Sequence, residues 1–230
     1  MALGKQNRQF EGKNYSLQFK LKDGEKFVDQ GFFQVSEATG EKDAKGKNIY
    51  KEIGRETDVA GDLVGIMTDS RDTENGVVRS FTLALNDSEK KETYYTKFSL
   101  GSNLGRRTAN VILNLQAFEN VQLSSYSQEN TETKKIYPAL SVRQGESNVT
   151  IKPKFDAKAA DSKLPKARAY EGKGGKTEYD YTSQEVFLLE QLKEFGKVVS
   201  EASKKRVPNT PAPASTDKAQ QENLDEDVPF

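Results

Sequence analysis

The chain has 230 residues, of which 34% are hydrophobic and 30% charged, with no cysteine, no histidine and a formal net charge of zero. The lack of cysteine excludes disulfides, thiolate zinc sites and thiol catalysis, and the lack of histidine excludes serine–histidine and cysteine–histidine nucleophiles. No apolar run reaches transmembrane length, and Met1–Lys5 do not open a signal peptide. We therefore expect a soluble, cytoplasmic protein with no membrane partner.

Alternation of apolar and polar residues predicts β-strands in the first part of the chain. Residues 14–22 (NYSLQFKLK) have the period of two that a half-buried strand requires, and apolar residues recur within 26–35. Residues 36–60 are polar and rich in glycine. We expect a long loop there, with room for a short strand near Ile49.

The middle of the chain predicts a hairpin and a further series of strands. Asn75 and Gly76 stand between two apolar runs, which is a strong hairpin signal. Residues 109–118 fit either a helix or a strand. Strands are expected over 62–68, 77–85, 93–100, 121–126, 135–143 and 148–155. Short strands with turn signals about every ten residues are typical of a barrel or sandwich.

The last third of the chain changes character. Residues 156–181 are polar, and Thr182 with Glu185 three residues later forms a capping-box pattern that opens a predicted helix over 182–206. Its apolar residues recur on one face, which favours a helix packed on the β domain over a dimerising coiled coil. These residues are Leu188, Leu192, Phe195, Val199 and Ala202. The proline-rich sequence that follows indicates a disordered linker.

Charge is unevenly distributed between the body and the C-terminal segment. Residues 207–230 contain five acidic residues and one lysine, a net charge of −4, so the remaining 34 basic and 30 acidic residues leave the body at +4. The segment closes with Asp225, Glu226, Asp227, Val228, Pro229 and Phe230. A cluster of carboxylates followed by an apolar tip suits a partner protein that offers basic side chains and an apolar pocket.

This tip resembles the C-terminal tail of single-stranded DNA-binding proteins of the bacterial and phage type. The resemblance implies an oligonucleotide-binding (OB-fold-like) barrel with insertions, one C-terminal amphipathic helix and a disordered acidic tail. It divides the chain into a DNA-binding domain over 1–181, the helix over 182–206, and a linker and tip over 207–230. It further implies a protein that is not an enzyme, needs no cofactor or metal, coats unpaired DNA in replication, recombination and repair, and recruits a polymerase, primase, helicase or nuclease through the tip. A homo-oligomer is compatible with this arrangement.

Binding to unpaired DNA requires cations for the phosphates and aromatic faces on which bases stack. Aromatic and basic residues are interleaved most densely in three parts of the body, and strand alternation places Tyr94 and Tyr95 on opposite faces, so one of the two is expected to pack inward. The candidate DNA-binding residues are Lys90, Lys91, Tyr94, Tyr95, Lys97, Arg106, Arg107, Tyr126, Lys134, Lys135, Tyr137, Arg143, Lys152 and Lys154.

Two other functions remain open from the sequence. One is a β-rich structural or assembly protein of a phage that uses the tail for docking. The other is a carboxylate-dependent, magnesium-using enzyme of nucleic-acid metabolism, although no carboxylate pattern in the chain marks a site for one.

Overall fold

The computed structural model describes residues 13–20, 27–44, 46–74, 76–129, 136–145, 149–156, 159, 161–172 and 174–206. These residues form eleven strands and two helices. In chain order the elements are β1 (Lys13–Lys20), β2 (Phe27–Lys42), β3 (Asn48–Glu56), β4 (Asp58–Thr73), β5 (Gly76–Asp87), β6 (Glu92–Ser99), α1 (Asn103–Ile112), β7 (Val121–Glu129), β8 (Ile136–Gln144), β9 (Val149–Thr150), β10 (Arg168–Glu171), β11 (Thr177–Asp180) and α2 (Thr182–Arg206).

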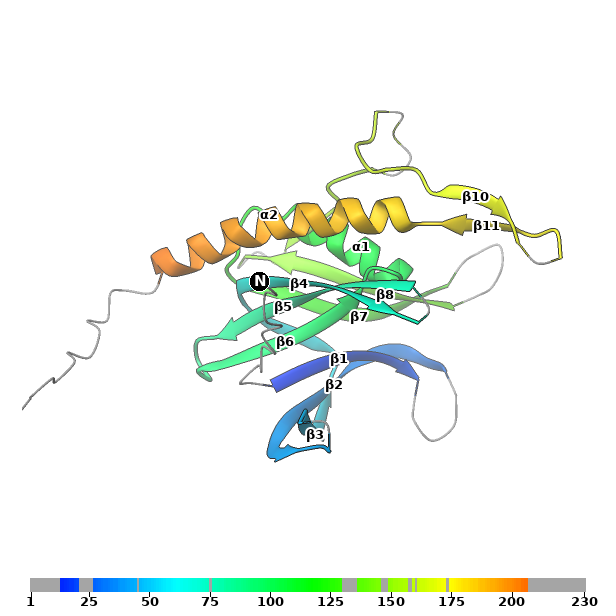
Figure 1. Cartoon of the computed structure of the whole chain (residues 1–230). Helices are drawn as coiled ribbons and strands as arrows, with labels where there is room; N and C mark the ends of the chain where they lie inside the picture. The colour runs from blue at the N-terminus through cyan, green and yellow to red at the C-terminus, as the bar shows by residue number, and fades with distance from the viewer. Residues whose placement is uncertain are drawn as a thin grey trace, which may run out of the picture.

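Nine of the described strands form one open sheet in the order β3-β2-β1-β6-β5-β4-β7-β8-β9. The neighbours pair antiparallel except β1 and β6, which run parallel. Strand β4 is long enough to pair with β5 over most of its length and with β7 through Asp58–Gly61. The sheet bends strongly, so that β1, β2 and β3 turn away from the plane of β4, β5 and β6 (Figure 1).

The core lies on the inner face of this bent sheet. Alternate residues of the central strands point to that face, and Phe33, Leu63, Phe81, Leu83 and Leu85 have no exposed surface. Burial of such side chains is the main favourable contribution to folding, about 1.5–3 kcal/mol for each. Helix α2 lies across β4 and β5 and adds its apolar stripe to the core, and α1 lies beside it (Figure 1).

Two contacts fix this arrangement at points of close approach. The Ser125 hydroxyl on β7 donates a hydrogen bond to the carbonyl oxygen of Gly31 on β2, and the Ser125 amide donates to the Thr57 carbonyl oxygen at 3.1 Å, so β2 and β7 are linked across the bent sheet. On α2, Gly196 lies so close to β4 that an added Cβ would come within 2.9 Å of the Ile66 carbonyl oxygen. The helix therefore packs directly on the strand backbone.

Much of the predicted architecture is confirmed. The described chain is mainly β, the hairpin turn falls between Thr73 and Gly76, and a helix spans Thr182–Arg206. The helix begins differently from the predicted capping box, because the Asp180 carboxylate accepts the Thr182 amide proton and the Tyr181 carbonyl accepts that of Glu185.

The structure corrects or refines the sequence-based description in four segments. The expected loop over 36–60 is instead the end of β2, the strand β3 and the start of β4, and the short strand expected near Ile49 is present as part of β3. The ambiguous segment 109–118 belongs in part to α1, which begins earlier, at Asn103, so the described chain contains a second helix. The strand expected over 148–155 is only the two-residue β9. Within the polar region 156–181, strands β10 and β11 form a separate hairpin. The C-terminal linker and tip lie outside the described residues.

Candidate functional site

The outer face of the sheet, opposite the core, carries polar and aromatic side chains from several strands. Pairing registers place Tyr95 on β6, Asn14 on β1 and Ser36 on β2 in one row across the sheet. The next row contains Gln34 of β2 opposite Ser16 of β1. The two helices pack against the other face, so in the described part of the chain neither helix covers these rows.

A shallow cavity of about 140 Å³ marks this outer face where β1, β6 and β5 meet. It is lined by Asn14, Tyr15, Ser16, Thr82, Tyr95 and Lys97. Lys97 reaches Asp69 on β4, with 3.8 Å between Nζ and Oδ2, and both side chains are more than half exposed. Small residues of β5 lie between their strands, where Ser80 and Thr82 are only 3% and 8% exposed. The cavity is thus lined by the Tyr95 ring, the Lys97 cation and small polar side chains.

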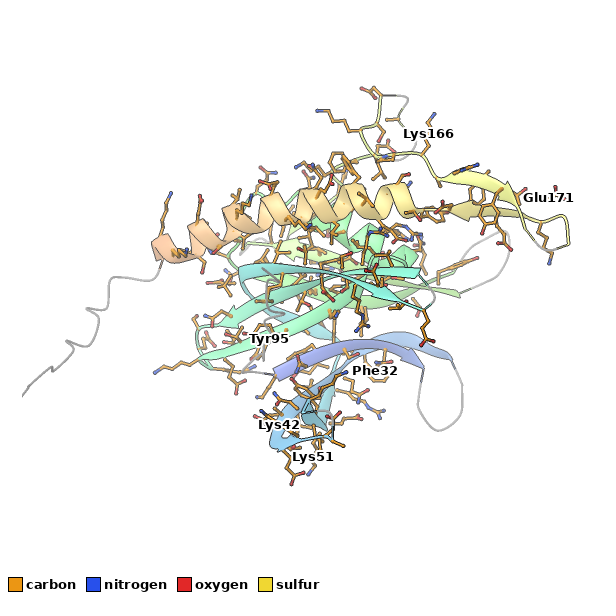
Figure 2. The ribbon with its side chains drawn as sticks, viewed as in Figure 1. Phe32, Lys42, Lys51, Tyr95, Lys166 and Glu171 are labelled. Carbon is orange, nitrogen blue, oxygen red and sulfur yellow. The ribbon has the colours of Figure 1, made fainter. Side chains whose placement is uncertain are left out.

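A second aromatic side chain with an adjacent cation lies on the same face, at the β2–β3 hairpin. The Arg55 guanidinium lies 5.0 Å from the centre of the Phe32 ring. Phe32 lies on β2, two strands away from β6, and is four residues from Ser36, the β2 residue in the row of Tyr95. These two displacements place the Phe32 and Tyr95 backbones about 16 Å apart across the sheet. Figure 2 shows both labelled side chains on neighbouring parts of the sheet. Tyr50, 40% exposed, extends the same side of the hairpin.

The polar side chains of the hairpin hold Arg55 in place. Glu52 accepts hydrogen bonds from Gln34 Nε2 at 2.8 Å and from Arg55 Nε at 3.1 Å. The carboxylate therefore balances the charge of Arg55 and orients its guanidinium toward the ring. A cation beside an aromatic face can contact a phosphate while the ring stacks on a base.

Tyr94 points away from this face, as alternation requires. It is 4% exposed, its ring centre lies 4.9 Å from that of Tyr15, and its hydroxyl donates to Asp87 Oδ2 at 3.0 Å. Burial raises the pKa of Tyr94, and the hydrogen bond to Asp87 adds to the effect. Tyr94 is therefore a core residue with no ring face open to a base, and its assignment to the DNA-binding set is corrected.

Lys90 and Lys91 lie in the turn before β6. Lys90 Nζ is 3.4 Å from Asp87 Oδ2 and 5.8 Å from the centre of the Tyr94 ring, and Lys91 has a positive φ of 54°. The Asp87 carboxylate accepts the Lys90 amide proton, and this hydrogen bond is the largest cause that lowers the pKa of Asp87. Both lysines are exposed near the start of the strand that carries Tyr95.

Arg106 and Arg107 lie on α1 rather than in the predicted loop. Arg107 is exposed, but Arg106 is only 8% exposed and donates through Nη1 to the carbonyl oxygens of Leu100 and Gly101, both at 3.0 Å. Its guanidinium lies 3.9 Å from the centre of the Tyr181 ring. Arg106 thus fixes α1 to the end of β6 and does not lie on the outer face.

Tyr126 and Tyr137 are neighbours on β7 and β8, whereas Arg143 lies at the far end of β8, opposite Gln122. Tyr126 pairs with Ala139 and Tyr137 with Gln128, so the two tyrosines are diagonal neighbours, 39% and 43% exposed. Arg143 helps to lower the pKa of Asp58, although the main cause is a hydrogen bond from the Ser124 side chain. The two tyrosines form a second aromatic pair, separated from Tyr95 by β5 and β4, and Arg143 does not join it.

The remaining predicted residues are spread more widely. Lys152 and Lys154 are exposed in the segment after β9, and Lys154 Nζ lies 5.7 Å from the centre of the Phe155 ring. Lys134 and Lys135 lie outside the described residues, as does the acidic tip from Asp225 to Phe230.

Sequence reasoning missed Phe32, Tyr50 and Arg55 as surface residues. Phe32 was grouped with core strand residues, and the other two fell in the expected loop. The sequence signal that could have identified Phe32 is the alternation along β2. If this strand continues past Val35, Phe32 and Gln34 alternate with the buried Phe33 and Val35, and they must face outward.

The described residues show no sign of two other kinds of site. Across the described ranges, no three acidic side chains gather as a metal ion would require. Neither described helix is both long enough and apolar enough to cross a membrane. The outer face offers aromatic rings, cations and amides.

Comparison of the chain with protein-family models, with curated proteins and with solved structures gives no match.

Proposed function

We propose that the protein binds single-stranded DNA on the outer face of its sheet. The observation that carries the proposal is the cavity at Tyr95 and Lys97, together with Phe32 and Arg55 on the same face. Each group pairs a ring with a cation, which suits one base and one phosphate of an unpaired strand. The acidic tip, which resembles the tail of single-stranded DNA-binding proteins, supports the same function independently.

The order of the strands supports an OB-like reading of part of the sheet. If β4, β5, β6, β7 and β8 are the five strands of such a fold, β5 and β6 are its second and third strands. OB folds bind oligonucleotides on the face of those two strands. Thr82 of β5 and Tyr95 and Lys97 of β6 lie there. Strands β1, β2 and β3 then extend the binding face beyond β6.

The charges on this face predict binding that depends on stacking as well as on phosphate contacts. Lys97 and Arg55 each have an acidic neighbour, Asp69 and Glu52 respectively. The face is therefore less positive than a purely electrostatic groove. Because each ring contributes about 1–3 kcal/mol per stacked base, affinity persists at salt concentrations that remove phosphate contacts.

The tip is proposed to recruit enzymes that act on the bound DNA. Its carboxylates match basic surfaces, and Phe230 matches an apolar pocket on the partner. A variant lacking residues 222–230 is expected to keep or increase its affinity for DNA and to lose binding to a purified polymerase, primase, helicase or nuclease. Equal loss of both activities would contradict this division of roles.

The test of the main proposal is a titration of the full chain into labelled oligo(dT) at several salt concentrations. We expect binding at low salt that weakens as salt rises, because phosphate contacts release counterions. The variant Tyr95→Ala is expected to bind more weakly, while Val198→Ala, an exposed change on α2, is the matched control. Absence of binding at low salt would favour a structural or assembly role instead.

A further inference from the structure

The hairpin of β10 and β11 is an arm that stands apart from the sheet (Figure 1). Its two strands pair only with each other among the described strands, and every residue in them is exposed. A two-stranded hairpin without further packing is marginally stable in water. The arm nevertheless carries Tyr170 and Tyr179, with 48% and 55% of their surface exposed. These aromatic rings contribute little to the core of their own chain.

A cavity of about 530 Å³ lies at the base of this arm. Its lining comes from the arm, the start of α2, α1 and the end of β6, and comprises Gly101, Arg106, Arg168, Tyr170, Tyr179, Asp180, Tyr181 and Glu185. The cavity thus contains two guanidinium groups, two carboxylates and three phenol rings.

Flat groups lie along one side of the cavity, with the Tyr179 ring tilted by 41° from that of Tyr181. The Arg106 guanidinium lies 3.9 Å from the Tyr181 ring centre, and the Tyr179 ring centre lies 6.3 Å from that of Tyr181. Burial lowers the pKa of Arg106, but an arginine stays charged at neutral pH. The Arg106–Tyr181 stack is rigid because Arg106 is bound to two backbone carbonyls. The more exposed Tyr179 can then stack on a planar ligand.

Charge at the cavity is nearly balanced. Glu185 already faces Arg79 at 3.4 Å, and Asp180 accepts the amide proton of Thr182. Arg168 is exposed at the rim of the cavity, opposite Asp180 in the hairpin register. A ligand with a flat polar ring and one negative group matches this set better than a polyanion does. A nucleotide has this chemistry.

The cavity lies within reach of the outer face described above, although its residues on α1 and α2 belong to the side of the sheet that carries the helices. Strand β6 carries Tyr95 and Lys97 and leads directly to Gly101, which lines the cavity. Gly101 is six positions beyond Tyr95 in the chain, a span of at most about 20 Å when extended. A single strand bound at Tyr95 can therefore reach the base of the arm by passing the end of β6.

We infer that the arm cavity is a second binding site for one nucleotide of the same single strand. The base stacks on Tyr179, and Arg168 contacts the phosphate. This inference rests on the proposed function, because it extends the path of DNA already placed on the outer face. Oligonucleotides that are too short to span both sites bind only at one of them.

The test compares labelled oligo(dT) of about 4 and about 16 nucleotides, the two ends of the range that OB folds cover. The variants are Tyr179→Ala and Arg168→Ala, both at exposed positions whose replacement leaves the core intact. Lys176→Ala is the matched control, because it removes an exposed charge from the same arm without touching the cavity. Tyr95→Ala reports separately on the outer face.

We expect Tyr179→Ala to weaken binding of the longer oligonucleotide about tenfold, the loss typical of one stacked base. Binding of the shorter oligonucleotide changes less than that of the longer one, and Lys176→Ala leaves both close to wild type. Wild-type affinity of Tyr179→Ala and Arg168→Ala for the longer strand, with a loss in Tyr95→Ala, overturns the arm site and leaves the proposed function intact.

Three other results would reject the nucleotide site at the arm. If the wild-type protein binds neither oligonucleotide, the proposed function and the arm site both fail. If Lys176→Ala loses as much affinity as Arg168→Ala, the arm acts only through diffuse charge, and the site is rejected. If the arm variants change sedimentation of the free protein but not DNA affinity, the arm contacts protein, and the nucleotide assignment is wrong.

Discussion

The ion pair between Lys97 and Asp69 offers a direct test of the outer face. If Lys97 contacts a phosphate, Asp69 competes with that phosphate for the same ammonium group. Their charged atoms are 3.8 Å apart, and the side chains are 55% and 54% exposed. An exposed pair of this kind contributes about 0–1 kcal/mol. Asp69→Asn is therefore expected to tighten binding of oligo(dT) by up to about fivefold.

The matching variant Lys97→Ala has the opposite effect. Loss of one phosphate contact reduces the slope of log affinity against log salt by about 0.7 for a single strand. Fluorescence anisotropy across a salt series measures both the affinity and this slope. In the double variant, Asp69→Asn is expected to improve binding much less than it does alone, because the lysine that it releases is absent.

Two results would refute this reasoning. An unchanged salt slope in Lys97→Ala would mean that the lysine contacts no phosphate. An equal gain from Asp69→Asn with and without Lys97 would mean that the carboxylate acts only through long-range repulsion, and the local pairing would then have no part in DNA binding.

Three further predictions concern stacking, helix packing and pH. Tyr95→Ala should weaken oligo(dT) binding by about fivefold or more, since a stacked base contributes about 1–3 kcal/mol; an unchanged dissociation constant would count against stacking. Gly196→Ala should lower the free energy of unfolding in urea by about 1–3 kcal/mol, because its Cβ would meet the Ile66 carbonyl oxygen at 2.9 Å; a gain of stability, the usual result in a helix, would contradict the packing. Asp87→Asn should destabilise the protein at neutral pH, and the difference from wild type should shrink as pH falls below about 4, because a lowered carboxyl pKa stabilises the fold only above that range; a difference that does not change with pH would argue against the charge.

The strands were predictable where alternation was regular. The hairpin of β2 and β3 was not predicted, because glycines interrupt the alternation there. Gly40 and Gly46, at φ of 82° and 74°, lie in the end of β2 and in the turn that follows, and Gly54 lies beside an irregularity in the β2–β3 register. Each glycine was consistent with a loop. In the folded chain these glycines allow bends within the β2–β3 hairpin. Because the hairpin was not predicted, Arg55 and Tyr50 could not be assigned to the outer face from the sequence.

Helix α1 was ambiguous for a tertiary reason. Asn110 is a poor helix former, yet its side chain donates to the Phe155 carbonyl at 2.8 Å and accepts the Phe155 amide proton at 2.9 Å. That partner lies far along the chain and cannot be inferred from local pattern. The start of the helix was more accessible, because the Ser102 hydroxyl accepts the Gly105 amide proton as an N-cap.

The candidate site was predictable in part. Alternation placed Tyr94 and Tyr95 on opposite faces without indicating which of them packs inward, and the structure places Tyr95 and Lys97 at one cavity. The burial of Arg106 was not predictable, because the charged residue lies in a contact between α1, the end of β6 and Tyr181. Local sequence thus indicates which residue types are present but not which of them face the same surface.

The most direct measurement is to crosslink the full chain to oligonucleotides that contain photoreactive thymine analogues and to map the modified residues by mass spectrometry. We expect crosslinks at Tyr95 and Phe32, the two rings of the outer face that have an adjacent cation. Crosslinks confined to the exposed side of α2, or none at low salt, would contradict this expectation.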